Sequence, residues 1–375
     1  MNSCRVTAVS FVAMLFSPLA HAEYGLNMTR GVTEISREVY DLHMLIFYIC
    51  CAIGVVVFGI MFWSIYSHRK SRGAVAAQFH HNTGLELIWT AIPIVILIIM
   101  AIPATQTLIE MEATGDADMT IKVTGHQWKW EYEYMDEGFK FFSILDSKSN
   151  EIRQLNSGLD PASVEHYLLD VDKPLVVPVG SKIRFLTTAA DVIHAWWVPA
   201  LGWKRDSIPG FINESWAVIE EEGTYRGQCT ELCGRDHGFM PIVLKAVSED
   251  AYFDWVGDML VAADDANAGA DREWSMDELM ERGKESYATF CQACHQADGK
   301  GIPGAFAALA GGPIATGPVD GHIDIVMHGK PGTAMAAFGP QLGDVDLAAI
   351  ITYERNAWGN DTGDRVQPAD IAAKR

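Results

Sequence analysis

The sequence carries little positive charge. Its 28 Lys and Arg residues are outnumbered by 48 Asp and Glu residues, which gives a formal net charge of −20. Nucleic-acid binding needs a basic surface, so this balance argues against that class of function. An acidic surface favours recruitment of a basic protein partner by electrostatic steering, and it is equally typical of a surface that only confers solubility.

The sequence also has no cysteine to spare for structural disulfide bonds. Of its seven cysteines, Cys4 lies in a predicted signal segment, and Cys50 and Cys51 lie in an apolar run that favours a packing role. The other four form two compact motifs, Cys229 with Cys233 and Cys291 with Cys294. Exported proteins often contain disulfides, but here the spacings indicate cofactor sites instead.

The N-terminal region predicts export and a membrane anchor. Residues 1–22 have the pattern of a cleaved signal peptide, with an apolar core and a small-x-small site at Ala20-His-Ala22. Within the following segment, 23–115, two apolar stretches at 42–66 and 87–108 are long enough to span a bilayer.

The charges between these two spans predict the topology. The connecting loop contains four basic residues, His68, Arg69, Lys70 and Arg72. The positive-inside rule places such a loop in the cytoplasm. The chain after the second span is then expected on the outer, periplasmic side of a bacterial cytoplasmic membrane.

The remainder of the sequence predicts two exported domains. Residues 116–250 show alternating apolar patterns punctuated by Pro and Gly, which are typical of an antiparallel β-sandwich. Residues 251–274 are small and acidic and are interpreted as a linker. Residues 275–360 are predicted to be helical, with helices at 276–290 and 346–358, and 361–375 are expected to form a polar, mobile tail.

One short run predicts a soft-metal site. Cys229-Thr-Glu-Leu-Cys233-Gly-Arg-Asp-His237-Gly-Phe-Met240 holds two thiols, an imidazole and a thioether, and His194 lies upstream. Sulfur and imidazole ligands select copper or zinc, and a thioether is a natural weak ligand for copper. The set has one thiolate more than a mononuclear blue-copper site needs, so two bridging thiolates would allow two coppers to share the site.

A second run predicts covalently bound haem. Cys291-Gln-Ala-Cys294-His295 is the c-type haem motif, in which the thiols add to the haem vinyl groups and the imidazole lies under the iron. The surrounding sequence resembles a small class I cytochrome c. That pattern favours Met335 as the distal ligand, while Met327, His322 and His328 are alternatives by residue type. The carbonyl of Pro303 is expected to hold His295.

The copper run is similar to the dinuclear copper centre (CuA) of cytochrome c oxidase subunit II. The resemblance implies that Cys229 and Cys233 bridge the coppers and that His194 and His237 each bind one. It also implies Met240 as a weak ligand and the backbone carbonyl of Glu231 as the sixth. The family fold is a two-helix transmembrane hairpin with an all-β, cupredoxin-like Greek-key domain, here followed by an all-α cytochrome c domain.

The resemblance assigns further roles outside the copper ligands. Trp128 is implied to be the surface tryptophan through which an external cytochrome passes its electron. The neighbouring Lys129 departs from the aromatic expected there, and a charged side chain predicts a solvated face. Glu86 is implied to lie at the mouth of a proton-uptake path into subunit I. The Glu231 side chain is implied to reach a magnesium ion shared with that subunit.

These features together predict the electron-accepting subunit of a haem–copper oxidase of the caa3 type. Electrons from a soluble cytochrome c or the fused haem c would pass through CuA to subunit I, where oxygen is reduced with proton pumping. Subunit III and membrane lipid are further expected partners. The alternatives are a quinol oxidase subunit, which would lack the copper ligands, a copper-pair subunit of a nitric oxide reductase, and a copper-storage or chaperone protein.

Overall fold

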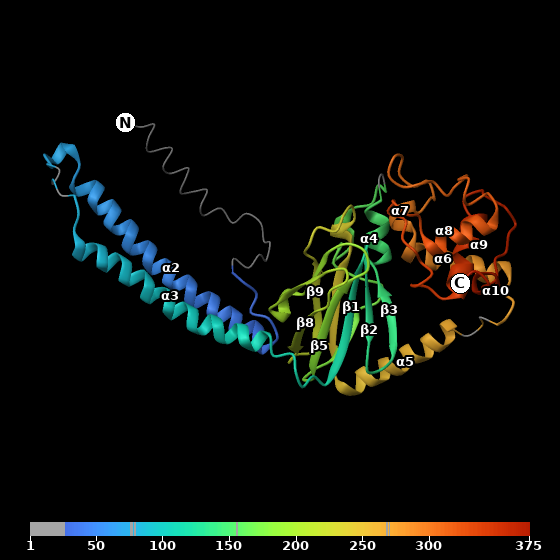
Figure 1. The fold of residues 1–375 in the computed structure, drawn as a ribbon, viewed down its shortest axis with the longest axis horizontal. Helices are drawn as coiled ribbons and strands as arrows, with labels where there is room; N and C mark the ends of the chain where they lie inside the picture. The colour runs from blue at the N-terminus through green and yellow to red at the C-terminus, as the bar shows by residue number, and fades with distance from the viewer. Residues whose placement is uncertain (1–26, 76–77, 79, 155–156, 268, 270) are drawn as a thin grey trace.

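The protein is described by a computed structural model that covers residues 27–75, 78, 80–154, 157–267, 269 and 271–375. The predicted signal peptide, 1–22, lies outside the described residues. Figure 1 shows a long helical hairpin, a central β-domain and a helical C-terminal domain following one another along the molecule.

The hairpin consists of α2 (Glu34–Ser67) and α3 (Thr83–Met111), connected through the 3-10 turn η1 (Lys70–Arg72). Thr33 caps α2 in a capping box with Ser36, and Asn82 caps α3. Both helices are long and apolar enough to cross a membrane, and both contain the predicted spans. Their apolar side chains are exposed in the single chain, as expected of surfaces that face lipid or other subunits.

The β-domain consists of two five-stranded sheets in the described part of the chain. One sheet has the order β3-β2-β1-β5-β8 and the other β4-β10-β9-β6-β7. The strands are β1 (Met119–His126), β2 (Lys129–Tyr134), β3 (Phe139–Ser143), β4 (Leu175–Pro178), β5 (Lys182–Ala189), β6 (His194–Trp197), β7 (Lys204–Ser207), β8 (Asn213–Val218), β9 (Gly223–Cys229) and β10 (Pro241–Val247). Short helical pieces connect them at α4 (Ser147–Ile152), η2 (Pro161–Ser163), η3 (Pro199–Leu201) and η4 (His237–Phe239).

The expectation of a purely antiparallel sandwich is wrong in two places. The strands β1 and β5 pair in parallel, as do β4 and β10. In each pair the partners are distant in sequence because the chain crosses between the sheets, as it does in a cupredoxin-like Greek-key fold. Local alternation of residues indicates a strand but carries no information on the direction of its partner.

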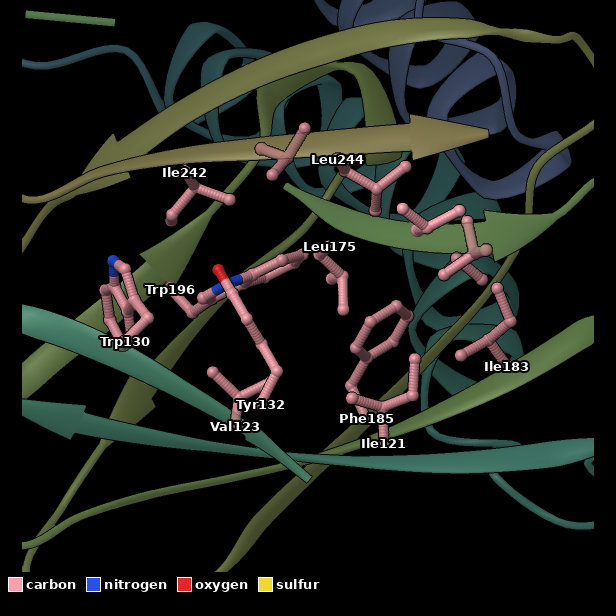
Figure 2. Packing of buried hydrophobic residues seen from close by; sticks show 14 of the residues in the cluster. Ile121, Val123, Trp130, Tyr132, Leu175, Ile183, Phe185, Trp196, Ile242 and Leu244 are labelled. Carbon is pink, nitrogen blue, oxygen red and sulfur yellow. The ribbon is translucent and has the colours of Figure 1, made fainter. Parts of the chain in front are cut away.

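The space between the sheets is filled by aromatic and aliphatic side chains (Figure 2). The strand β2 contributes Trp130, Tyr132 and Tyr134, all with zero exposure, and the opposite sheet contributes Trp196 and Leu244. The aromatic side chains of β2 therefore pack into the core of this domain. Burial of each such side chain stabilises the fold by roughly 2–3 kcal/mol.

The segment predicted as a linker begins as a helix, α5 (Glu249–Asn267). Tyr252 and Val256 are buried on the β-domain, and the Trp255 ring lies 5.3 Å from the ring of Tyr134. These positions form a helical stripe, which the small and acidic composition of the segment concealed. The first part of the linker is thus fixed to the β-domain.

The C-terminal domain is helical, as predicted. It contains α6 (Met276–Phe290), α7 (Gln292–His295), α8 (Val319–His328), α9 (Asp344–Asn356) and α10 (Pro368–Ala372). A capping box of Ser275 and Glu278 begins α6. The expectation of a mobile tail after residue 360 is wrong, because Val366 and Ile371 are buried in the core of this domain.

Candidate functional site

The predicted copper ligands converge between β9 and β10. Cys229 ends β9, and the loop returns to β10 directly after Met240. The two Sγ atoms lie 3.8 Å apart, and Met240 Sδ lies 3.6 Å from Cys233 Sγ. His237 Nδ1 lies 3.5 Å from the same sulfur. Both thiols and the thioether are buried, whereas His237 is half-buried.

His194 completes the cluster from the first residue of β6. Its Nδ1 lies 3.9 Å from Cys229 Sγ, and its imidazole is fully buried. The ligand atoms of His194, Cys229 and Cys233 all lie within 4.8 Å of one another. Gly125 makes room for this imidazole, because a Cβ there would lie 2.8 Å from Cδ2 of the His194 ring.

Asp191 orients His194 and was not singled out by sequence reasoning. Its Oδ1 lies 2.9 Å from His194 Nε2, which leaves Nδ1 to face the sulfurs. Burial opposes protonation, but the hydrogen bonds to Asp191 and Cys229 outweigh it and raise the pKa of His194. A carboxylate three residues before a ligand histidine was the available signal.

The copper loop is held from behind by side chains of the β1–β2 region. The carbonyl oxygen of Cys233 accepts hydrogen bonds from Gln127 Nε2 at 2.8 Å and Trp128 Nε1 at 3.2 Å. Trp130 Nε1 donates to the Met240 carbonyl oxygen at 3.3 Å. These bonds fix the loop from outside the ligand cluster and so help to position the ligands.

A buried ion pair supports the same loop from α4. Arg153 Nη1 lies 3.0 Å from Asp236 Oδ2, and the exposed fraction of the Asp236 side chain is 2%. The Arg153 guanidinium also lies over the ring of Phe239 at 4.4 Å. Sequence reasoning missed this pair because its partners are far apart along the chain.

The two thiols titrate as a coupled pair. Their mutual hydrogen bond, followed by the bond to His194, lowers the pKa of Cys229, and the same bond together with burial raises the pKa of Cys233. The pair therefore ionises in two steps, and the second proton leaves when a cation replaces it. Two thiolates, two imidazoles and a thioether within this spacing fit soft, copper-type ions better than hard cations.

Glu231 contributes differently through its backbone and its side chain. Its carbonyl oxygen lies 3.4 Å from Cys229 Sγ, at the edge of the cluster. Glu231 is exposed, so its carboxylate is accessible at the surface of the loop.

The haem-attachment motif spans the end of α6 and α7. Cys291 is buried, and Cys294 and His295 are half-buried. Burial raises the pKa of Cys291 well above its usual value and that of Cys294 to about 11. His295 Nδ1 lies 2.8 Å from the carbonyl oxygen of Ala307. The expectation that Pro303 holds this histidine is therefore corrected, since the partner comes later in the same turn-rich segment.

The four candidates for the distal ligand occupy different environments. Met335 is half-buried in a loop that packs against the domain core. Met327 is buried inside that core, and His322 is buried with Nε2 2.7 Å from Glu354 Oε2. His328 is exposed.

The structure corrects the expectation for Trp128 and Lys129. Trp128 is 9% exposed and Lys129 is 4% exposed, so neither lies on a solvated face. Burial lowers the pKa of Lys129 to about 8. The Lys129 ammonium lies over the rings of Phe290 and Phe338, from the helical C-terminal domain, and of Phe142, from β3.

Glu86 lies in the first turn of α3 and is half-buried. This first turn lies next to the loop that connects the two membrane helices. Glu86 thus lies at the predicted start of the second span.

The fold and the clustered donors define a membrane-anchored protein with a soft-metal site and a haem-attachment domain. Comparisons with known families agree with that class. Residues 119–247 match the periplasmic domain of cytochrome c oxidase subunit II, and 21–107 match its transmembrane domain. Residues 278–353 match cytochrome c oxidase, cbb3-type, subunit III.

The matched part of this chain spans most of the length of the curated relatives described here. The probable cytochrome c oxidase subunit 2 of Rickettsia bellii is 40% identical over 67% of this chain and 91% of its own. The subunit 2 of Cereibacter sphaeroides is 37% identical over 62% of this chain and 79% of its own. The crystallised periplasmic domain of subunit II from Bradyrhizobium japonicum is 41% identical, with a TM-score of 0.35, over 40% of this chain and 98% of that one.

The chain belongs to the cytochrome c oxidase subunit II family, as predicted. It is therefore a subunit of an oxidoreductase complex that contains subunit I, anchored in the membrane with its copper domain on the periplasmic side. Family membership implies a CuA centre, and the C-terminal match implies haem c.

Proposed function

We propose that this chain accepts electrons from cytochrome c and relays them through its copper centre to subunit I, where oxygen is reduced to water with proton pumping. The observation that carries the proposal is the cluster of Cys229, Cys233, His194, His237 and Met240, with its sulfurs 3.8 Å apart. When bound, the copper pair supplies one-electron storage, with the charge shared between two ions.

The chain's own residues keep the site rigid. Hydrogen bonds to the backbone of Cys233 and Met240 hold the loop, and Asp191 holds His194. A site that cannot rearrange between oxidation states supports fast electron transfer, because little reorganisation accompanies each electron. The sulfur atoms of the two cysteines and the methionine are buried, so water is also excluded from the centre.

In the cytochrome domain, Cys291 and Cys294 would attach the haem and His295 would ligate it, with its ring held by the Ala307 carbonyl. Met335 is the proposed distal ligand. It lies in a loop at the edge of the core, whereas Met327 is part of the core and His322 is engaged with Glu354. Trp128, through its bond to the Cys233 carbonyl, is the proposed route to the copper.

Two further residue roles and two further partners belong to the same proposal. Glu86 would admit protons to subunit I from the cytoplasmic edge of α3. The exposed Glu231 carboxylate would reach a magnesium ion held with subunit I. A soluble cytochrome c and subunit III would complete the assembly.

Metal analysis and EPR of the purified full chain test the copper assignment. We expect two coppers per chain and hyperfine structure from an electron shared by two nuclei. Cys233→Ser should abolish that signal, because one of the two thiolates that would hold the copper pair is lost. Cys50→Ser is the matched control, since Cys50 is an exposed thiol of α2, and it should keep the signal. Recovery of one zinc ion per chain would contradict the proposal.

The haem ligand is tested separately. Met335→Ala should remove the weak red absorption band that reports methionine bound to haem iron. Met327→Leu preserves volume in the core and should keep the band. A band that survives in Met335→Ala would exclude Met335 as the ligand. Measuring whether the assembled complex consumes oxygen or nitric oxide distinguishes an oxidase from a nitric oxide reductase.

A further inference from the structure

The helical C-terminal domain packs on the β-domain through its haem-attachment segment. Phe290, which ends α6, meets Phe142 of β3 edge-on, with ring centroids 5.0 Å apart and an interplanar angle of 87°. Arg235 of the copper loop donates from Nη1 to the Ala293 carbonyl oxygen at 3.2 Å. Figure 1 shows α7 on the side of that domain that faces the β-domain and α4.

Lys129 lies at the centre of this contact. Its ammonium is 5.3 Å from the ring centroid of Phe142 in its own domain. It is 4.7 Å from Phe290 and 5.6 Å from Phe338, both in the cytochrome domain. Ring faces attract a cation most strongly when water is excluded, and Lys129 is only 4% exposed.

The two domains share the stabilisation of this charge. Burying an ammonium is costly unless other groups compensate for its lost hydration. Two of the three rings around Lys129 belong to the cytochrome domain, so removal of that domain would take away most of the aromatic enclosure. A lysine with this environment is suited to a docked domain and poorly suited to an open face.

The same contact covers Trp128. The indole is 9% exposed, and a small cavity beside it is lined by Ala288, Thr289 and Ala293 of the cytochrome domain. A soluble protein donor therefore cannot reach this ring while the domain is docked.

We propose that Lys129, held among Phe142, Phe290 and Phe338, positions the tethered cytochrome domain over Trp128 and reserves that face for it. A soluble donor then delivers electrons to the cytochrome domain instead of directly to the copper domain. The inference deepens the proposed function and rests on it for the role of Trp128. Lys129 is a positioning residue, since it acts through the docked domain.

Oxidative footprinting of the full, copper- and haem-loaded chain tests the contact. Brief exposure to hydroxyl radicals oxidises accessible tryptophans, and mass spectrometry reads each site. Trp128 should be strongly protected relative to Trp197, which is 37% exposed in the same domain. Equal oxidation of the two rings would overturn the proposal.

Variants identify the residue that holds the domain. Lys129→Met keeps the length of the side chain but removes the charge, and it should raise the oxidation rate of Trp128 by about ten-fold. Lys140→Met is the matched control, because Lys140 lies on the neighbouring strand β3 and pairs with Glu131 across the sheet. Trp128 should stay protected in this control.

Two checks keep the result decisive. The copper spectrum must be retained in each variant, which shows that the β-domain is folded. Phe338→Leu weakens the same contact from the cytochrome side and should also expose Trp128. Unchanged protection in both Lys129→Met and Phe338→Leu would overturn the proposal. Because footprinting measures contact and not electron transfer, a failure here is distinct from loss of copper in the Cys233→Ser experiment.

Discussion

At the scale of single residues, His126 is a buried imidazole beside the copper domain's docking face. It is 5% exposed, its ring meets Phe142 edge-on, and Nε2 has no hydrogen-bond partner among the described residues. Burial, and secondarily the charge of Lys129, lowers the pKa of His126 from 6.5 to about 3. The folded domain therefore holds this ring neutral.

The pH dependence follows from that shift. Below about pH 6.5 the unfolded chain binds a proton at His126, whereas the folded chain does not bind it until the pH falls to about 3. This contribution to stability is therefore fully present above 6.5 and is lost as the pH falls, with a limiting slope of about 1.4 kcal/mol per pH unit. Urea unfolding of the β-domain between about pH 7 and 5 should show it.

Paired variants separate this slope from other titrations. His126→Gln should flatten the pH dependence relative to the unaltered protein. His81→Gln changes an exposed histidine at the start of α3 and should leave the slope as it was. A slope that is the same in all three proteins would show that His126 titrates alike in the folded and unfolded states.

At the scale of elements, the cytochrome domain depends on the close crossing of α6 and α9. A Cβ on Gly283 would lie 2.1 Å from the Ala349 carbonyl oxygen, so the helices touch along their backbones. Gly283→Ala should force them apart and cost about 1–3 kcal/mol in the free energy of unfolding. Thermal unfolding followed at the haem absorption band measures this loss.

A second glycine provides the comparison. Gly321 lies in α8 with nothing within 4 Å of the position of its Cβ. Gly321→Ala should be neutral or stabilise by up to about 1 kcal/mol, because it only restricts the unfolded chain. Equal destabilisation by the two substitutions would mean that helix propensity, and not the crossing, decides the outcome.

At the scale of the whole molecule, the net charge of −20 bears on how a soluble donor arrives. A basic cytochrome c should reduce the full complex with a rate constant that falls about ten-fold or more between low and high salt, because salt screens steering. Electron transfer from the tethered haem to copper should not change with salt, since no encounter is needed. Stopped-flow absorbance can resolve the two phases; a shared salt dependence would contradict internal transfer.

Much of the fold could be read along the chain, because the signals are local. The apolar lengths of the two spans, the alternation in β1 and β5, and the boundaries of α6 depend on nearby residues only. The parallel pairing of β1 with β5 and the packing of α5 and the tail depend on distant partners. In α5 and the tail the composition misled, since small or acidic residues on one face hid an apolar stripe on the other.

The sequence by itself determined the ligand types and their spacing, because metal and haem chemistry needs particular atoms at short range, and these determined the family. Only the tertiary structure decided what surrounds them. Asp191 and Arg153 support the copper ligands, and Lys129, a charge that predicts a wet surface, lies buried among aromatic rings from two domains. Whether a charged side chain meets water or a ring depends on which segments fold against it, and that information is not local.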